Sequence, residues 1–172
     1  MIHIVLYQPE IPQNTGNIIR SCAATGAELH LIEPLGFRLD AKTLKRTSVQ
    51  HVEDVGVSVY PDWDSFRHTH PGPWVFLTRY GKKSHDQARM SDPHAHIYLI
   101  FGKESTGIPK SILRPHLDQC YRIPMKSSMR SLNLANAVAI VLYEALRQQH
   151  FPELSLTEPE IQKGADWLSQ DD

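Results

Sequence analysis

Short runs of apolar residues alternate along this chain with segments that carry apolar residues at helical spacing. Such alternation is typical of α/β proteins, in which helices connect the strands of a mostly parallel sheet and cover its faces. We therefore predict an α/β fold with a mostly parallel sheet flanked by helices. The length of 172 residues corresponds to about one domain.

The expected strands are Ile2–Tyr7, Glu28–Ile32, Val55–Tyr60, Trp74–Thr78, Ile97–Phe101 and Gln119–Ile123. The expected helices are Thr15–Ala24, Ala41–Thr47, Trp63–His68, Lys110–Leu113 and Leu132–His150. The last helix is the longest and carries a single apolar stripe. Gly26 stands where the cap at the carboxyl end of the first helix would lie.

Charge is distributed unevenly along the chain. Residues 151–172 hold six acidic residues against Lys163, so the other 150 residues carry 17 basic and 13 acidic side chains, a net charge of +4. This distribution permits a polyanionic partner, although the whole chain has a net charge of −1.

The sequence contains no membrane-length apolar run and begins without the cationic head of a signal peptide, so we expect a cytoplasmic protein that binds no membrane. Cys22 and Cys120 are expected to be buried, reduced thiols.

Three loops follow expected strands, at the edge of an α/β sheet where ligands collect. The first, residues 8–20, lacks the GxGxxG pattern of dinucleotide-binding turns. Asn14 or Thr15 is expected to cap the next helix, and Arg20 is placed to project toward an anion at the helix mouth. A capped helix with a surface arginine is the alternative.

The second loop, residues 100–109, contains Gly102 and Gly107, which permit close approach of the backbone. Its Glu104 is either held for function or is simply an exposed acid. In the third loop, residues 122–137, we expect Ser131 or a neighbour to cap the long helix. Asn133 is a poor residue inside a helix unless its side chain forms hydrogen bonds, and capping alone is the alternative role.

Together the loops resemble the motifs of the SPOUT superfamily of α/β-knot RNA methyltransferases, over roughly residues 1–150. The resemblance is tightest to the small tRNA wobble-nucleotide 2′-O-methyltransferases, the TrmL family. It rests on four stretches in order: PEIPQNTGNIIR, LHLIEPLGF, FGKESTGIP and RIPM…RSLNLANAVA. The second loop departs from the usual Gly-Pro-Glu-Thr-Arg-Gly of relatives, because Lys103 replaces the proline and Thr106 replaces the arginine.

The resemblance implies a SPOUT α/β-knot domain over residues 1–154, with a deep trefoil knot near its carboxyl end, followed by an acidic extension at 155–172. It implies that S-adenosylmethionine binds in the knot loops, and from the residues themselves we expect no metal. The residues implicated in binding the cofactor are Leu77, Gly102, Ile123, Met125, Ser131 and Leu132. Two His-x-His pairs, at 68–70 and 94–96, lack further ligands at metal-binding spacing, and we interpret them as loop histidines.

The resemblance also assigns the central catalytic role to Arg20, with Asn14, Glu104 and Asn133 positioning groups around it. Because the pKa of arginine exceeds about 12, we expect Arg20 to orient the ribose or phosphate and to stabilise a developing alkoxide, and the proton acceptor stays open. RNA contacts are expected from two basic stretches, which are equally explained as solvated faces. These residues are Arg38, Lys42, Lys45 and Arg46, and then Arg79, Lys82 and Lys83, with Tyr80 available for stacking.

The predicted function is S-adenosylmethionine-dependent 2′-O-methylation of the wobble nucleotide, cytidine or uridine 34, in tRNA, with leucine isoacceptors suggested by family analogy. The expected partners are tRNA rather than DNA and a second copy of the chain, bound through the long final helix. One alternative is ribose methylation at another tRNA or rRNA site. The other is a noncatalytic knotted RNA-binding module.

Overall fold

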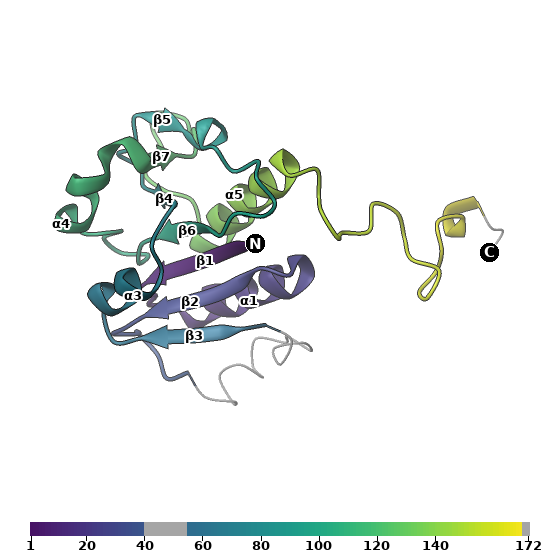
Figure 1. The fold of residues 1–172 in the computed structure, drawn as a ribbon, viewed down its shortest axis with the longest axis horizontal. Helices are drawn as coiled ribbons and strands as arrows, with labels where there is room; N and C mark the ends of the chain where they lie inside the picture. Colours follow the sequence, from purple (N-terminus) through teal and green to yellow (C-terminus); the bar gives the residue numbers. More distant parts are fainter. Residues whose placement is uncertain (40–54, 170–172) are drawn as a thin grey trace.

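A single sheet of seven strands organises the computed structural model, which describes residues 1–39 and 55–169. The strands are β1 (Ile2–Tyr7), β2 (Glu28–Ile32), β3 (Val57–Tyr60), β4 (Trp74–Leu77), β5 (Lys83–Ser84), β6 (Ile97–Phe101) and β7 (Cys120–Arg122). They lie in the order β3-β2-β1-β6-β4-β7-β5, and each neighbouring pair is parallel (Figure 1). The predicted parallel α/β sheet is therefore confirmed.

Helices cover both faces of this sheet. They are α1 (Pro12–Thr25), α3 (Trp63–Thr69), α4 (Lys110–Leu113) and α5 (Leu134–Gln148), with short 3₁₀ turns at His85–Gln87, Arg114–Gln119 and Trp167–Ser169. Helices α1 and α5 pack on one face, where they contact each other, and α3 lies on the opposite face (Figure 1). None of these helices is long and apolar enough to span a bilayer.

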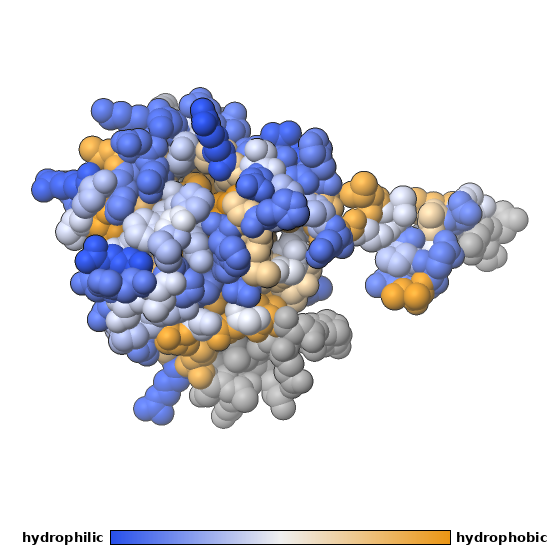
Figure 2. All heavy atoms as spheres, viewed as in Figure 1, coloured by the Kyte–Doolittle hydropathy of each residue, from blue (hydrophilic) through white to orange (hydrophobic). Residues whose placement is uncertain are grey.

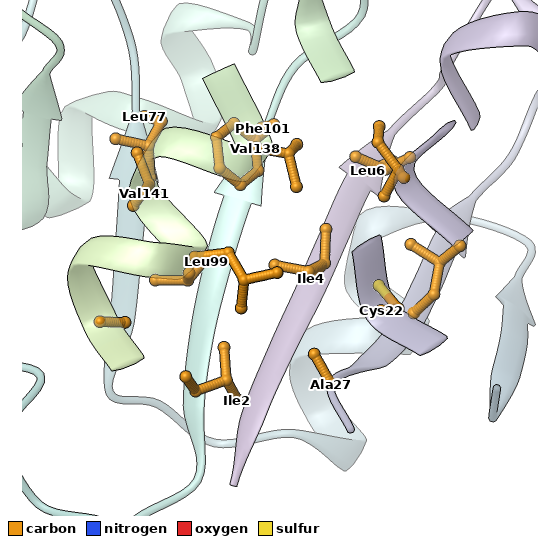
Figure 3. Packing of buried hydrophobic residues seen from close by; sticks show 14 of the residues in the cluster. Ile2, Ile4, Leu6, Cys22, Ala27, Leu77, Leu99, Phe101, Val138 and Val141 are labelled. Carbon is orange, nitrogen blue, oxygen red and sulfur yellow. The ribbon is translucent and has the colours of Figure 1, made fainter. Parts of the chain in front are cut away.

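The core follows from the alternation of side chains along the strands. Ile4 and Leu6 of β1 face α1 and α5, whereas Val5 faces the opposite cluster around Phe66 (Figure 3). All three strand residues are fully buried, as expected for a parallel sheet covered on both sides. Cys22 and Cys120 are buried free thiols, as predicted, and burial raises the pKa of Cys22 to about 12.

Strands β1, β2 and β6 have the predicted bounds, and β3 begins two residues later than predicted. The left-handed conformation of Gly26 (φ 71°) confirms the predicted end of α1. The short strand β5 was not predicted, because Lys83 and Ser84 carry no apolar pattern. The helix expected at 41–47 lies outside the described residues.

The cap predicted for α1 is wrong, and the cap of α5 is Asn133, a neighbour of the Ser131 that was named for it. Helix α1 begins at Pro12, three residues earlier than predicted, so Asn14 and Thr15 lie inside its first turn, and Ile11 is the N-cap residue without a side-chain bond. Proline favours this first position because its fixed φ suits a helix and the N–H it lacks has no helical partner there. Helix α5 is capped by Asn133, not Ser131: the Asn133 Oδ1 accepts from the backbone N–H groups of Ala135 (2.9 Å) and Asn136 (3.2 Å).

The chain leaves the body of the fold after α5 (Figure 1). Phe151 and Leu154 still pack against the core. Beyond them, Leu156, Ile161 and Leu168 are 78%, 94% and 89% exposed, and the segment extends away from the sheet (Figure 2).

Candidate active site

A cavity of about 890 Å³ opens beyond the carboxyl ends of β4, β6 and β7. Small-molecule sites in proteins typically measure about 300 to 1,000 Å³, and parallel sheets place them at this edge. The six residues predicted to bind the cofactor all line the cavity, namely Leu77, Gly102, Ile123, Met125, Ser131 and Leu132. Asn14, Glu104 and Asn133, predicted to be catalytic, line it as well.

Gly102 allows the loop after β6 to fold back against the end of the strand. The loop closes where the N–H of Gly107 donates to the carbonyl of Lys103 at 3.0 Å, and Gly107 has a φ of 72°. A Cβ atom on Gly102 would lie 2.3 Å from the backbone of Gly107 and Ile108, so only glycine fits at this position. Because it has no side chain, Gly102 contributes only main chain to the lining of the cavity.

Two glutamates clasp the first and second loops together. The carboxylate of Glu104 accepts from the backbone N–H groups of Glu10 (2.9 Å) and Ile11 (3.2 Å). The carboxylate of Glu10 in turn accepts from the Ser105 hydroxyl (2.8 Å) and the Ser105 N–H (2.9 Å), and these bonds lower the pKa of Glu10. Since neither loop has regular structure here, these reciprocal bonds fix their relative position.

The third loop joins this clasp through asparagine side chains. The Asn14 Nδ2 donates to Glu104 Oε1 at 2.9 Å, and the Asn133 Nδ2 donates to Asn14 Oδ1, also at 2.9 Å. Asn14 is only 6% exposed, so its amide is held between its two partners. Three residues from distant parts of the sequence thus form one hydrogen-bonded network, here called the Glu104–Asn14–Asn133 network.

Arg20 is the one predicted catalytic residue that the cavity does not include. It lies on an exposed position of α1, and its side chain forms no hydrogen bond or ion pair within residues 1–39 and 55–169. Lys103, the residue that departs from the family pattern, donates from Nζ to Gln8 Oε1 at 3.1 Å and so adds a further link between the first two loops.

Cationic and aromatic side chains stand at the cavity wall. Arg79, Tyr80 and Arg130 line it, with the Arg79 guanidinium 5.3 Å from the centroid of the Tyr80 ring, which is 73% exposed. Arg130 was missed as a candidate because in the sequence it is a single basic residue among the polar residues that precede α5. Lys83 is engaged elsewhere, since its Nζ donates to the Asp118 carbonyl at 2.7 Å.

Two further residues predicted to contact RNA, Lys82 and Arg38, do not line this cavity. Lys82 and Arg38 are exposed, and Arg38 lines a separate hollow with Leu35 and Phe37. Lys42, Lys45 and Arg46 lie outside the described residues.

A second polar cluster, missed by the sequence analysis, lies at the amino ends of β1 and β2. His3 and His30 are each 3% exposed, and burial lowers the pKa of His3 to about 3 and that of His30 to about 4, helped by neighbouring histidines. Both imidazoles are therefore neutral near pH 7. Glu28 and His30 lie two residues apart on β2, but only the register of β1 against β2, which pairs His3 with Glu28, adds His3, so no local motif could have indicated the whole cluster.

Comparison with known proteins places these features in context. The family described as SpoU rRNA Methylase matches residues 1–143. A Geobacillus stearothermophilus protein, provisionally named a tRNA (cytidine(34)-2′-O)-methyltransferase, is 48% identical over 155 residues, which are 90% of this chain and 99% of that protein. The tRNA (cytidine(34)-2′-O)-methyltransferase of Saccharophagus degradans is 45% identical over 154 residues, covering 88% of this chain and 97% of that protein.

Solved structures agree with this likeness. A structure described as giving insight into the 2-OH methylation of C/U34 on tRNA has a TM-score of 0.79 and 41% identity, over 87% of this chain and 97% of that one. The SpoU methyltransferase AviRb of Streptomyces viridochromogenes, in complex with AdoMet, has a TM-score of 0.68 and 29% identity, over 86% of this chain and 57% of that one.

Proposed function

The chain belongs to the SpoU rRNA methylase family, as its motifs predicted, and we propose that it transfers a methyl group from S-adenosylmethionine to the ribose 2′-oxygen of nucleotide 34 in tRNA. The observation that carries the proposal is the Glu104–Asn14–Asn133 network at the wall of a cavity lined by all six expected cofactor residues. By family analogy, leucine isoacceptors are the expected substrates.

The cavity suits the cofactor in size and chemistry. Backbone groups of Leu77, Gly102 and Ile123 at the strand ends would bind the edge of the adenine, and the side chains of Met125 and Leu132 would cover its faces. When bound, S-adenosylmethionine supplies a methyl group that its sulfonium already activates. The remaining task of the protein is to align the acceptor oxygen and to assist loss of its proton.

The Glu104–Asn14–Asn133 network performs the alignment. It joins the loops that follow β1 and β6 to the start of α5, so the walls of the site keep one relative position while RNA binds. Since the hydrogen-bonding atoms of Glu104 are already engaged by the protein, we assign it a positioning role. Positioning of this kind matters because a displacement of about 1 Å at a reacting centre can cost about a hundredfold in rate.

Arg20 acts on the RNA and not as a base, because a guanidinium remains protonated at working pH. It would orient the ribose or an adjacent phosphate and stabilise the developing alkoxide.

Because Arg20 lies outside the cavity of its own chain, we infer that a second copy presents it. Ile140 and Tyr143 on the outer face of α5 are 40% and 48% exposed, and α5 packs beside α1, so a homodimer formed through α5 would also involve the helix that carries Arg20.

The RNA would approach the cavity past Arg79, Tyr80 and Arg130, where a base can stack and phosphates can pair. We propose as outer phosphate contacts Lys82, Lys83, Arg38, Lys42, Lys45 and Arg46.

We also propose that the fold contains the trefoil knot, that residues 1–154 form the methyltransferase domain and are followed by an acidic extension, and that the protein is cytoplasmic. The knot is supported by the strand order, in which β6 separates β1 from β4 while the chain after β7 returns to pack α5 on β1 and β6.

The test is transfer of labelled methyl from S-adenosylmethionine to total tRNA that lacks wobble methylation, followed by nucleoside mapping. We expect label on ribose 34, and label at another nucleotide would replace the proposed site by a different tRNA or rRNA target. Binding of RNA without cofactor binding or transfer would favour the noncatalytic module.

Arg20→Ala tests the catalytic assignment. We expect methyl transfer to be abolished while the affinity for S-adenosylmethionine, measured by calorimetry, stays within a few-fold, because Arg20 does not line the cavity. Mixing this variant with an Asn133→Ala chain should restore activity if one copy supplies Arg20 to the other. Near-normal turnover by Arg20→Ala alone would remove Arg20 from the mechanism.

A further inference from the structure

Two buried histidines and a glutamate direct ligand atoms to one spot at the amino ends of β1 and β2. The His3 Nδ1 lies 2.9 Å from His30 Nε2 and 3.2 Å from Glu28 Oε2, and the remaining pair, His30 Nε2 and Glu28 Oε2, is 3.8 Å apart. A tetrahedral Zn²⁺ ion with bonds of about 2.0 to 2.2 Å holds its ligand atoms about 3.3 to 3.6 Å from one another. A point equidistant from the three atoms lies about 2 Å from each, so the triangle matches one face of such a coordination shell.

The outer nitrogen of each histidine also has a partner. His3 Nε2 lies 2.8 Å from His96 Nδ1, and His30 Nδ1 lies 3.1 Å from the Tyr60 hydroxyl. If both outer nitrogens carry the proton and donate it to these partners, both inner nitrogens present lone pairs toward Glu28. Metal-binding histidines use their second nitrogen in this way, which fixes the tautomer and the ring orientation.

We propose that His3, His30 and Glu28 form a binding site for a divalent transition-metal ion of the Zn²⁺ type, separate from the methyltransferase site. Two neutral imidazoles and one carboxylate suit such an ion and leave one position for water, whereas Mg²⁺ and Ca²⁺ prefer oxygen ligands. The Glu28 side chain is 43% exposed and provides a route of entry to a site whose histidines are buried.

The position of the site indicates a structural role for the ion. It would join β1 to β2 at their amino ends, where His30 contacts Phe66 of α3 and His70 at the end of that helix, whereas the methyltransferase cavity lies beyond the carboxyl ends of the strands. Binding to the folded state alone raises stability. We therefore expect the ion to raise Tm and to leave the rate of methyl transfer within about twofold, so the metal site and the methyltransferase function are tested separately.

The experiment uses the full chain after treatment with a chelator. Co²⁺ is titrated in as a spectroscopic probe, and Zn²⁺ binding is measured by calorimetry and by the change in Tm. We expect one equivalent of Co²⁺ to give the intense visible bands of tetrahedral coordination, which Zn²⁺ then displaces. Absence of these bands together with absence of binding heat would overturn the proposal and leave a chain of hydrogen bonds in which His3 Nδ1 donates to His30.

Three variants separate this site from adventitious binding to the other histidines. Glu28→Gln preserves volume at a half-exposed position, and it should weaken Zn²⁺ binding and remove the Zn²⁺-dependent rise in Tm. Tyr60→Phe removes the partner of His30 Nδ1 and should weaken binding about 10- to 100-fold. His94→Gln changes an exposed histidine outside the site and should bind Zn²⁺ as the wild type does. Equal Zn²⁺ affinity in wild type and Glu28→Gln would contradict the proposal.

Discussion

At the scale of single residues, Asn133 performs two tasks with the two ends of one amide. Its oxygen caps α5 by accepting from Ala135 and Asn136, and its nitrogen donates to Asn14 in the cavity wall. The poor helix propensity of asparagine predicted hydrogen bonding at this position, and the cap was expected at Ser131 or a neighbour. Capping and bridging are separable because they use different atoms.

A pair of substitutions tests this separation. Asn133→Asp keeps an oxygen that can cap the helix but places a carboxylate against the Asn14 oxygen. We expect near-wild-type stability, because the cap is kept. We also expect a 10- to 100-fold loss of methyl transfer, because displaced groups at a reacting centre lower the rate. Asn133→Ala removes the two capping bonds and the bridge to Asn14, and it should also lower the free energy of unfolding by about 1 kcal/mol. Denaturant titration and the labelled-methyl assay give the two readouts. Wild-type activity of Asn133→Asp would show that the bridge to Asn14 has no part in positioning.

At the scale of elements, the pattern of apolar residues predicted the interior strands well. It predicted poorly those helices and strands whose ends lie among polar residues. Strands β1, β2 and β6 are buried on both faces, so burial alone sets their bounds. The start of α1 depends instead on the φ of Pro12, and β5 depends on pairing with β7, which no local pattern records. The same reason explains why the gathering of His3, His30 and Glu28 was missed, since it depends on strand register.

Helix α5 offers a test of electrostatics within one element. The Glu144 carboxylate accepts from Arg147 Nε (2.8 Å), Arg147 Nη2 (2.9 Å) and Gln148 Nε2 (2.9 Å), and these bonds lower the pKa of Glu144 to about 2. Gln148 also accepts from the N–H of Met90, so the group ties α5 to a neighbouring loop. Since the folded-state pKa lies below the ordinary 4.5, the carboxylate stabilises the fold above pH 4.5, and this contribution is lost as the pH falls toward 2.

Glu144→Gln should therefore be less stable than wild type at pH 7 by about 0.5 to 1 kcal/mol, a range typical of a pair whose arginine is largely exposed. The difference should shrink as the pH falls from 4.5 toward 2, because the wild type protonates and the variant does not. Urea denaturation of both proteins at pH 7, 4 and 3 measures it. A difference that stays constant between pH 7 and 3 would show that titration of Glu144 does not contribute.

At the scale of the whole molecule, sequence patterns predicted well which residues gather at the candidate site, but they did not predict that one of these residues lies outside it. Nine of the ten residues predicted to bind the cofactor or act in catalysis line one cavity, because the motifs follow strands that a parallel sheet brings to the same edge. Arg20 is the exception. Its position relative to a second copy of the chain cannot be predicted from a local sequence pattern. Because the cavity of one chain does not include Arg20, the proposed dimer would bring Arg20 to the place where the proposed chemistry occurs.

The body of the fold is expected to end near Leu154, which gives a prediction for the last segment. A chain ending at residue 154 keeps Phe151 and Leu154 against the core, so its Tm should change by less than about 2 °C and its methyl transfer should equal that of the full chain. A chain ending at residue 150 loses both contacts, and we expect a loss of about 2 kcal/mol, equivalent to a fall in Tm of about 4 to 8 °C. Calorimetry and the labelled-methyl assay on both truncations give the comparison. If the chain ending at 154 is inactive or as unstable as the shorter one, the exposed apolar residues Leu156, Ile161 and Leu168 must contact the folded protein or its second copy, and the domain boundary moves beyond them.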